Sequence, residues 1–586
     1  MADDPKQSSV EQEALLFGAF LFLALIGVLV WFLHGRFYIT GSEVIEATIY
    51  GVLVMLYIFQ IIRYFQNREE RLMEMWPKPR IRISPADESK HLQEAAAQDS
   101  VLLGYDEIGK PFYWKNEIRS MQSTAIGATG SGKTELLKGI FQQDAARGGP
   151  VIFIDGKGEK KVVDQLLAYI DSIGRMGDVR VLDPTHSETS VSYNPFVGSS
   201  DRIDQQVAFV FDSFNRGQSS DSFFDEHQRT YLENIGRVLY HTGRRFNFYD
   251  ILVAAYDVTI LQGLMSTARN RVRRPGLATK QQILTLEMSI VNLLNTFNEP
   301  DRISKIQGLI NNLMSFMGED LALITGPYDN LLSLDDVIDQ NLILIVSLNT
   351  NVESKSTIAL GRILLQNLQL MIGKRYAAYS SGQTYPFVSV FMDEFAPFAY
   401  ANFATIINQA RGANVGFLTS IQNLPQLGEV SQAFQDNVGS SANTKFILRT
   451  AEETSVQNFL NESSKRKTVR RSMKIETAGM FNAGIKVGDT GTQSDVVDTR
   501  AQDFHVKCMP TGQMEFLMTD HKEGKIHKYL HVRRSFNYFT TEAAVGLYPT
   551  LKTPKWKSNG LNLRFAAPQL EAPRQERGRN KRRGGA

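Results

Sequence analysis

One eight-residue segment, Gly127-Ala128-Thr129-Gly130-Ser131-Gly132-Lys133-Thr134, restricts the fold of this chain more than any other part of its sequence. It satisfies the pattern G-x-x-x-x-G-K-[ST] at every fixed position, with an apolar strand pattern before it and a helical pattern after it. Backbone N–H groups of such a loop surround phosphate oxygens, and the N-terminus of the following helix adds positive potential. We therefore predict an ATP site. Its predicted binding residues are Gly127, Gly130, Ser131, Gly132, Lys133 and Thr134.

A pair of carboxylates follows a second apolar strand pattern much later in the chain. Residues 388–392 are apolar apart from Ser389, and Asp393 and Glu394 come next. In phosphoryl-transfer enzymes, a lysine such as Lys133 reaches the phosphates and a threonine hydroxyl with an aspartate holds Mg²⁺. We predict that Thr134 and Asp393 hold Mg²⁺, Asp393 through its hydration shell. Glu394 is then predicted to polarise the attacking water.

Three further features have competing interpretations. Gln422 follows a predicted strand and is placed to sense the γ-phosphate, although it also fits an ordinary strand end. Arg411 is a candidate arginine finger across a subunit boundary, or a solvated cation at the end of a helix. The segment 155–159, DGKGE, closes a buried strand at the sheet edge where ligands bind. Its charges either couple nucleotide to substrate or hold a loop through local ion pairs.

The secondary-structure pattern predicts an α/β fold interrupted by a helical insertion. Strand and helix patterns alternate over residues 101–200, helical periodicity dominates 201–339, and strand patterns return from 340. We predict one nucleotide-binding domain from residues 101–200 and 340–568, and an all-α domain from 201–339. Residues 67–100 are predicted to be a linker with a short helical patch at its end, and residues 569–586 a basic, disordered tail.

The N-terminus is predicted to be a membrane anchor over residues 1–66. Residues 14–33 are twenty uncharged, mostly apolar residues, which matches the hydrocarbon thickness of a bilayer. Residues 47–62 form a second, shorter apolar run. The acidic residues before the first run argue against a cleaved signal peptide. Arginines and lysines follow the second run, so the positive-inside rule predicts that both termini and the bulk of the chain are cytoplasmic.

Charge and cysteine content exclude some functions and leave others open. The 586 residues carry a net charge of +2, which excludes a uniformly basic surface but not a local basic groove. The single cysteine, Cys508, excludes an intramolecular disulfide framework and a cysteine-rich zinc site. Basic clusters at 269–274 and 465–474 can contact nucleic acid phosphates without reading sequence, or simply be solvated surfaces. We find no signature of sequence-specific DNA binding.

The order of these motifs resembles one family. Two apolar spans, GATGSGKT, DGKGE, YNPF, a helical insertion, FMDEFAPF and ARGANVGFLTSIQNLPQL follow one another over residues 14–460. This combination is similar to the type IV secretion coupling proteins, the TraD/TraG family of conjugation ATPases. The chain departs from the family at 155–159, where DPKGE is frequent.

The resemblance implies a RecA-like motor domain behind a two-helix transmembrane anchor, in the bacterial inner membrane. It implies assembly into a ring, with a hexamer as the expected form, that hydrolyses ATP at subunit interfaces. It also implies single- or double-stranded DNA, relaxosome or effector proteins and inner-membrane components of a secretion channel as partners. In this family Lys133, Thr134, Asp393, Glu394, Arg411 and Gln422 match motif positions.

Two other functions fit parts of the sequence. An FtsK-like DNA pump has a related core but usually more spans and a C-terminal winged helix, which this sequence does not show. A membrane scaffold that binds nucleotide without turnover would need the P-loop but not an active Glu394. The cargo, whether DNA with a relaxase or effector proteins, is not readable from the sequence.

Overall fold

The computed structural model describes residues 81–197, 203–214, 222–350, 354–379, 382, 385–403, 409–472, 475–476, 486–487, 492–536 and 560–565, with 52, 55–57 and 59–60. The chain divides into two compact units, Met1–Arg80 and Ile81–Ala586. Nearly all of the first unit, and with it nearly all of the predicted membrane anchor, lies outside the described residues, as does the predicted tail. Among the described residues, only α10 (Phe248–Tyr256) and α11 (Val258–Val272), a pair bent by 112°, pass a test of length and apolarity for a membrane span, and no single helix does.

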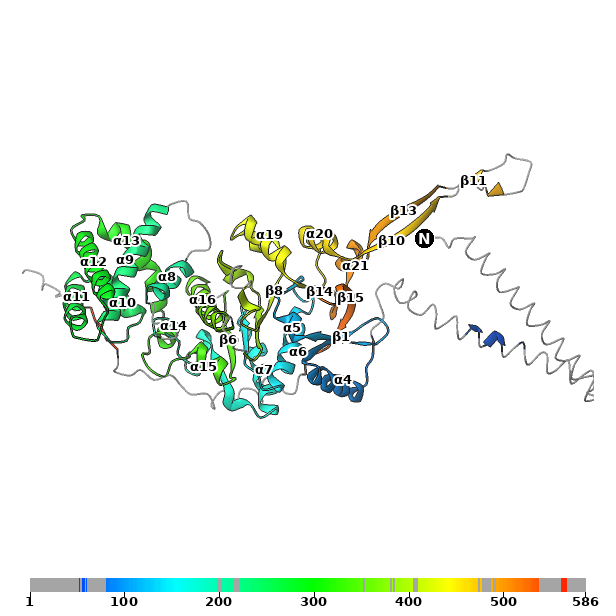
Figure 1. The fold of residues 1–586 in the computed structure, drawn as a ribbon, viewed down its shortest axis with the longest axis horizontal. Coiled ribbons are helices and arrows are strands. Elements are labelled where there is room, and N and C mark those ends of the chain that lie inside the picture. Colours follow the sequence, from blue (N-terminus) through cyan, green and yellow to red (C-terminus); the bar gives the residue numbers. More distant parts are fainter. Residues whose placement is uncertain are drawn as a thin grey trace, which may run out of the picture. The chain divides into compact units, whose positions relative to one another are not determined.

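A sheet of eleven described strands organises the second unit (Figure 1). The strand order is β2-β1-β15-β14-β9-β3-β8-β7-β4-β6-β5. The strands from β9 to β5 are parallel to one another, and β14, β15, β1 and β2 extend the sheet with antiparallel pairs. Its strands are β1 (Ser100–Tyr105), β2 (Pro111–Lys115), β3 (Ser123–Ile126), β4 (Val151–Asp155), β5 (Val179–Leu182), β6 (Ile343–Ser347), β7 (Val388–Asp393), β8 (Val415–Ile421), β9 (Thr444–Ile447), β14 (Gln513–Asp520) and β15 (Gly524–Val532).

Both faces of the parallel part are buried, as its unbroken apolar strand patterns predict. Val151 and Phe153 of β4 belong to a core that includes apolar residues of α6 (Lys133–Ala146) and α7 (Lys160–Ser172). Ile152 and Ile154 of the same strand point to the opposite core, which contains α16 (Ser354–Tyr379). Successive side chains of a strand alternate between faces, so each strand contributes to both cores.

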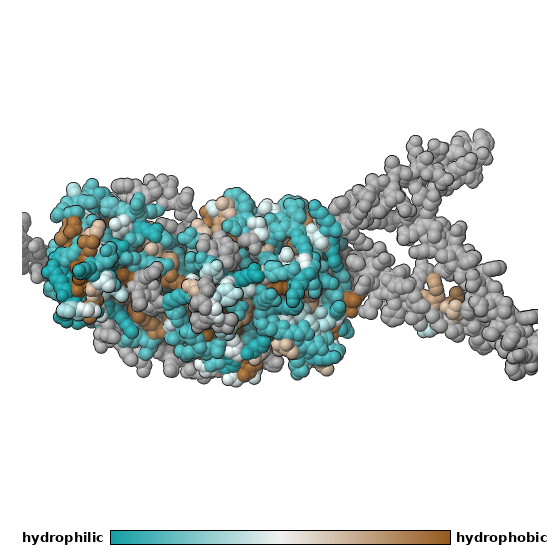
Figure 2. All heavy atoms as spheres, in the orientation of Figure 1, coloured by the Kyte–Doolittle hydropathy of each residue, from teal (hydrophilic) through white to brown (hydrophobic). Residues whose placement is uncertain are grey.

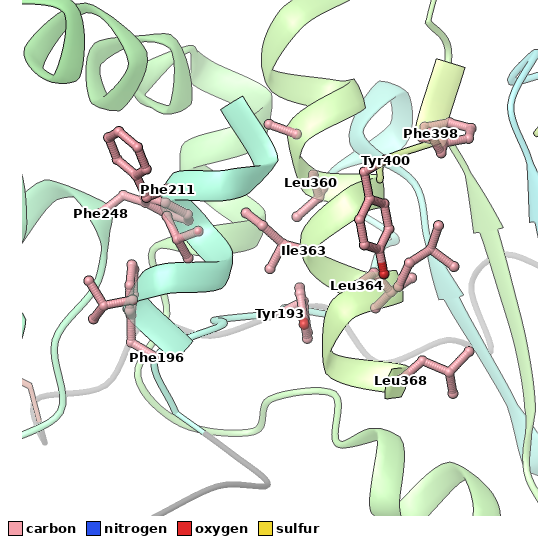
Figure 3. Packing of buried hydrophobic residues seen from close by; sticks show 14 of the residues in the cluster. Tyr193, Phe196, Phe211, Phe248, Leu360, Ile363, Leu364, Leu368, Phe398 and Tyr400 are labelled. Carbon is pink, nitrogen blue, oxygen red and sulfur yellow. The ribbon is translucent and has the colours of Figure 1, made fainter. Parts of the chain in front are cut away.

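The helical region between β5 and β6 is formed by eight helices in the described residues. They are α8 (Ile203–Phe214), α9 (Ser222–His241), α10, α11, α12 (Lys280–Phe297), α13 (Arg302–Met314), α14 (Glu319–Thr325) and α15 (Leu334–Asp339). Apolar side chains of this region and of α16 form one continuous core (Figure 3). Phe248 and Phe316 stack in it with ring centroids 4.1 Å apart. The insertion is therefore packed against the α/β part through an apolar core.

Shorter elements surround the sheet. They are α4 (Pro85–Ala97), α5 (Asn116–Arg119), α18 (Pro425–Gly428), α19 (Gln432–Ser441), α20 (Glu453–Glu462) and α21 (Asp503–Cys508). Ala95 of α4 packs against Leu102 and Tyr105 of β1, so the end of the predicted linker is a helix fixed to the sheet. Strands β10 (Lys465–Ser472) and β13 (Thr492–Thr499) pair as a separate antiparallel arm, drawn protruding in Figure 1, and β11 (Ile475–Glu476) pairs with β12 (Lys486–Val487).

Residues 560–565 differ from the predicted assignment. The sequence pattern assigns residues 340–568 to the α/β domain, but Leu561 donates its N–H to the carbonyl of Arg245, in the helical region. The outer surface is hydrophilic over most of the face drawn in Figure 2, with apolar side chains in separate groups.

Candidate nucleotide-binding site

The phosphate-binding loop lies between β3 and α6, as predicted. Gly130 and Gly132 have φ values of +74° and +107°, which glycine adopts without a Cβ penalty. Helix α6 begins at Lys133, and its N-cap residue is Gly132. No side-chain cap therefore occupies the first N–H groups of the helix. The first N–H groups of a helix lack partners inside the helix, so they are available to phosphate oxygens.

Lys133 is buried beneath this loop, with 4% of its surface exposed. Its ammonium donates hydrogen bonds to the carbonyls of Gly127 and Ala128, the latter at 3.2 Å. Burial lowers the pKa of Lys133, and the nearby carboxylates of Glu394 and Asp393 oppose that shift. A buried cation held at the mouth of a phosphate loop is suited to an anionic ligand.

Asp393, the last residue of β7, collects polar contacts from three other elements. Its Oδ2 accepts a hydrogen bond from the Thr134 hydroxyl at 2.6 Å, and its Oδ1 accepts one from Ser420 of β8 at 3.1 Å. The Lys157 ammonium lies 3.7 Å from Oδ2. Thr134 and Asp393 thus converge as hydroxyl and carboxylate oxygens, which are the hard ligands that Mg²⁺ prefers.

Glu394 adopts a backbone conformation that is rare for a non-glycine residue, with φ at +60°. Its side chain is largely buried, and Gln422 donates its Nε2–H to Glu394 Oε1 at 2.7 Å. Glu394 Oε2 has no hydrogen-bond partner among the described residues. Burial raises the pKa of Glu394, whereas the Lys157 and Lys133 ammonium groups oppose that rise. A carboxylate with a free buried oxygen and a raised pKa has the properties of a general base.

The DGKGE loop is connected to the same strand end. Asp155 accepts hydrogen bonds from the N–H groups of Lys157 at 3.0 Å and Glu159 at 2.9 Å, and Gly156 donates its N–H to the Asp393 carbonyl at 2.9 Å. Burial raises the pKa of Asp155 to about 6. The loop is thus held locally by N–H bonds to Asp155, and it presents Lys157 to Asp393. A role in coupling nucleotide to substrate stays a prediction.

A contact on the phosphate loop has no counterpart among the sequence predictions. Thr511 donates its hydroxyl hydrogen to the Gly130 carbonyl at 3.1 Å, and Gly512 donates its N–H to the Ser131 carbonyl at 3.4 Å. Gly512 has a φ of +84°. The local signal is the Pro510-Thr511-Gly512 turn, which nothing in the sequence connects with a loop 381 residues earlier.

The structure brings together Lys133, Thr134, Asp393, Glu394 and Gln422, whose individual roles stay predictions. It does not bring Arg411 to them within the chain. Arg411 precedes β8, whereas Gln422 follows it, and a strand of seven residues is about 20 Å long. Arg411 is exposed, and its Nη2 lies 3.3 Å from His521 Nε2. The arginine-finger role, which requires a neighbouring subunit, stays a prediction.

The basic cluster at 269–274 is partly neutralised. Arg269 makes a bidentate contact with Glu287, with Nη2 to Oε2 at 2.6 Å, and Arg273 Nη2 lies 3.4 Å from Glu287 Oε1. The cluster is therefore less available to phosphates than its sequence suggests. The other basic cluster lies mainly on β10, in the protruding arm.

The fold and the site together define a P-loop protein with a parallel α/β core. The parallel strand β8 separates the phosphate-loop strand β3 from β7, which ends in the carboxylate pair. The structure of the bacterial conjugative coupling protein TrwB, in a trigonal form in complex with sulphate, is similar to this chain with a TM-score of 0.50 and 12% identity. That similarity covers 77% of this chain and 94% of the other, and it supports the α/β fold.

Two comparisons of sequence point to the same family. Residues 388–498 match the family model described as the TraM recognition site of TraD and TraG. The type 4 coupling protein DotL of Legionella pneumophila is 22% identical over 535 residues, covering 81% of this chain and 64% of that protein's length. These matches confirm the resemblance to type IV coupling proteins that the order of motifs predicts.

Proposed function

We propose that this protein is a membrane-anchored ATPase that couples ATP hydrolysis to the transfer of substrates into a type IV secretion channel. The observation that carries the proposal is the convergence of Thr134, Asp393 and Glu394 beside the phosphate loop. The matches to coupling proteins support type IV secretion as the process in which this ATPase acts.

Each residue of the site has a distinct role in ATP hydrolysis. The N–H groups at the start of α6 and the Lys133 ammonium bind the phosphates of ATP. Thr134 and Asp393 would hold Mg²⁺, which neutralises charge on the phosphate oxygens. Glu394 accepts a proton from the water that attacks the γ-phosphorus, while the bond from that phosphorus to the bridging oxygen of ADP breaks. Gln422 keeps the Glu394 carboxylate oriented through its hydrogen bond.

Assembly and partners complete the proposal. The apolar runs 14–33 and 47–62 anchor the chain in the bacterial inner membrane, with its bulk in the cytoplasm. Copies assemble into a ring, a hexamer in the form we propose, in which Arg411 serves the nucleotide of a neighbouring subunit. The ring engages single- or double-stranded DNA without sequence specificity, and the helical region recruits relaxosome or effector proteins.

Substrate transfer in cells tests this function. We expect Lys133→Ala to abolish transfer of a reporter plasmid or effector when the variant replaces the wild-type chain at equal abundance in the membrane. Lys161→Ala, which alters an exposed lysine of α7, serves as a matched control and leaves transfer unchanged. Wild-type transfer by the Lys133 variant would refute the proposal.

A second measurement separates the proposal from an FtsK-like pump. Directional translocation along naked duplex DNA, without any other secretion component, would favour the pump. Crosslinking in cells that express Lys133→Ala should instead trap the chain with its cargo and with channel proteins.

A further inference from the structure

The segment Gly560–Phe565, which we call the docked segment, binds a groove of the helical region. The groove is formed by Arg245, Tyr249, Asp250, Tyr256 and Tyr328, and the docked segment is the short red stretch beside α10 in Figure 1. The docked segment contacts the groove through three main-chain N–H groups, and its Leu561 and Leu563 side chains pack against the apolar core.

Three consecutive N–H groups of the docked segment donate hydrogen bonds to the groove. Leu561 donates to the Arg245 carbonyl at 2.9 Å, Asn562 to the Tyr328 hydroxyl at 3.2 Å, and Leu563 to Asp250 Oδ1 at 2.9 Å. Residues 245 and 560 also form a parallel β-bridge. Extended peptides are recognised in this way when they bind to the edge of a folded domain.

The groove is built to receive these donors. Asp250 is completely buried, and its Oδ2 accepts hydrogen bonds from the Tyr328 hydroxyl at 2.9 Å and the Asn247 N–H at 3.1 Å. Its Oδ1 receives the N–H of Leu563. A buried carboxylate oxygen without a donor is costly, so this oxygen requires a peptide N–H or an equivalent donor in the groove.

Two side-chain positions add selectivity. A Cβ atom at Gly560 would lie 2.3 Å from the Tyr328 ring, so that position admits only glycine unless the ring moves. Phe565 meets the rings of Tyr249 and Tyr256 edge-on, with centroids 6.0 and 5.9 Å away. The groove therefore fits an extended peptide with a glycine and, five residues later, an aromatic residue.

The docked segment fills the groove only in part. A cavity of about 660 Å³ remains between Asn247, Thr325 and Tyr328 on one side and Asn562–Phe565 on the other. Phe565 is 41% exposed. Leu561 and Leu563 are only partly buried where they pack against the apolar core. A half-exposed segment beside an unfilled cavity has the properties of a peptide that can leave its site.

We propose that this groove is a docking site for extended peptides and that Gly560–Phe565 is its reversible occupant within the same chain. The inference goes beyond the proposed function and does not depend on it, because peptide docking requires neither ATP hydrolysis nor a secretion channel. A partner that presents an extended segment of the same chemistry would compete with the chain's own segment.

Competition with a synthetic peptide tests this docking. The probe is a fluorescein-labelled peptide of residues 558–568, SNGLNLRFAAP, titrated with the full chain and followed by fluorescence polarisation. In Gly560→Val the chain's own segment cannot seat against Tyr328 while every groove residue is intact. We expect the probe to bind this variant at least roughly tenfold more tightly than the wild-type chain, because a tethered competitor has a high effective concentration.

The controls separate docking from nonspecific binding and from misfolding. Arg564→Ala, at an exposed position of the segment, should bind the probe as weakly as the wild-type chain does. A probe that carries Val at the position of Gly560 should not bind. Equal binding to wild-type and Gly560→Val chains, binding of a scrambled peptide, or no binding to Gly560→Val would overturn the proposal. Hydrogen exchange then gives an independent reading: the amides of 561–563 should be protected in the wild-type chain and unprotected in Gly560→Val.

A crosslinking test checks that the occupant belongs to the same chain. Tyr249→Cys and Phe565→Cys, introduced together in a Cys508→Ser background, should be joined by a bismaleimide crosslinker within one chain, which changes mobility on a denaturing gel without producing a dimer. A crosslinked dimer would show an exchange of segments between copies and would contradict the assignment.

Discussion

Lys157 offers the sharpest test of how the carboxylate pair is tuned. Its ammonium lies 3.7 Å from Asp393 Oδ2 and is among the charges that hold down the pKa of Glu394. At an effective dielectric constant of about 20, two unit charges at that distance interact by roughly 4.5 kcal/mol. That energy is an upper bound for Glu394, since Lys157 faces Asp393 more directly and is 26% exposed to screening water.

The direction of the pKa shift of Glu394 follows from the charge that the substitution removes. Glu394 accepts a proton only when it is ionised, and burial already raises its pKa. Lys157→Gln removes a cation that stabilises the ionised form, so the pKa of Glu394 rises further. We expect the acid limb of the pH profile of ATP turnover to move to higher pH.

Two variants serve as controls for this assay. Lys157→Arg keeps the positive charge, so its acid limb should shift from the wild-type position much less than that of Lys157→Gln. Lys161→Gln removes an exposed charge from the following helix and should have no effect. A profile of Lys157→Gln that superimposes on the wild-type profile, or that moves to lower pH, would refute the electrostatic reasoning.

Three other changes have definite expected outcomes. Asp144→Ala leaves the buried Arg119 guanidinium without its bidentate partner, and urea denaturation should show a loss of about 3–5 kcal/mol; a loss below about 1 kcal/mol would contradict the buried pair. Gly512→Ala, at a φ of +84° beside the phosphate loop, should weaken binding of a fluorescent ATP analogue, whereas Gly524→Ala, at +77° in a distant turn, should cost similar stability without changing that affinity. Gln422→Ala should lower ATP turnover while nucleotide affinity stays unchanged, and equal turnover would show that orienting Glu394 is unimportant.

The sequence predicts the parts of the site that are contiguous or that end a strand. The phosphate loop is a single unbroken motif, and the Asp393–Glu394 pair directly follows an apolar strand. Gln422 follows another strand, and parallel strands bring their C-terminal ends to one edge of the sheet. These rules suffice to place Lys133, Asp393 and Gln422 near one another from the order of residues alone.

The remaining contacts depend on topology that no local pattern contains. Ser420 donates to Asp393 only because β8 lies between β3 and β7, and the chain order does not reveal that arrangement. Thr511 meets the phosphate loop because β14 and β15 extend the sheet beside β9. Residues 560–565 fold back onto the helical region, and their short polar and apolar sequence resembles any strand or turn.

The arginine at 411 shows a different limit. The sequence predicts a loop at this position, and in the structure Arg411 lies in a turn that precedes β8. A role across a subunit boundary depends on the geometry of the assembly, which the sequence of one chain does not specify. The same applies to the arm of β10 and β13. Its basic residues are easily recognised in the sequence, but the molecule that they contact in an assembly is not.

Glu394→Gln, assayed for both nucleotide binding and ATP turnover, tests the proposed catalytic site most directly. The substitution keeps the shape of the side chain and its neighbour Gln422 but removes the proton acceptor. We predict that turnover falls by a factor of roughly 10² or more while the affinity for Mg²⁺–ATP stays within about twofold of wild type. Equal turnover in the two proteins, whether substantial or negligible, would contradict a catalytic Glu394, and equal, negligible turnover would point to a nucleotide-binding scaffold instead.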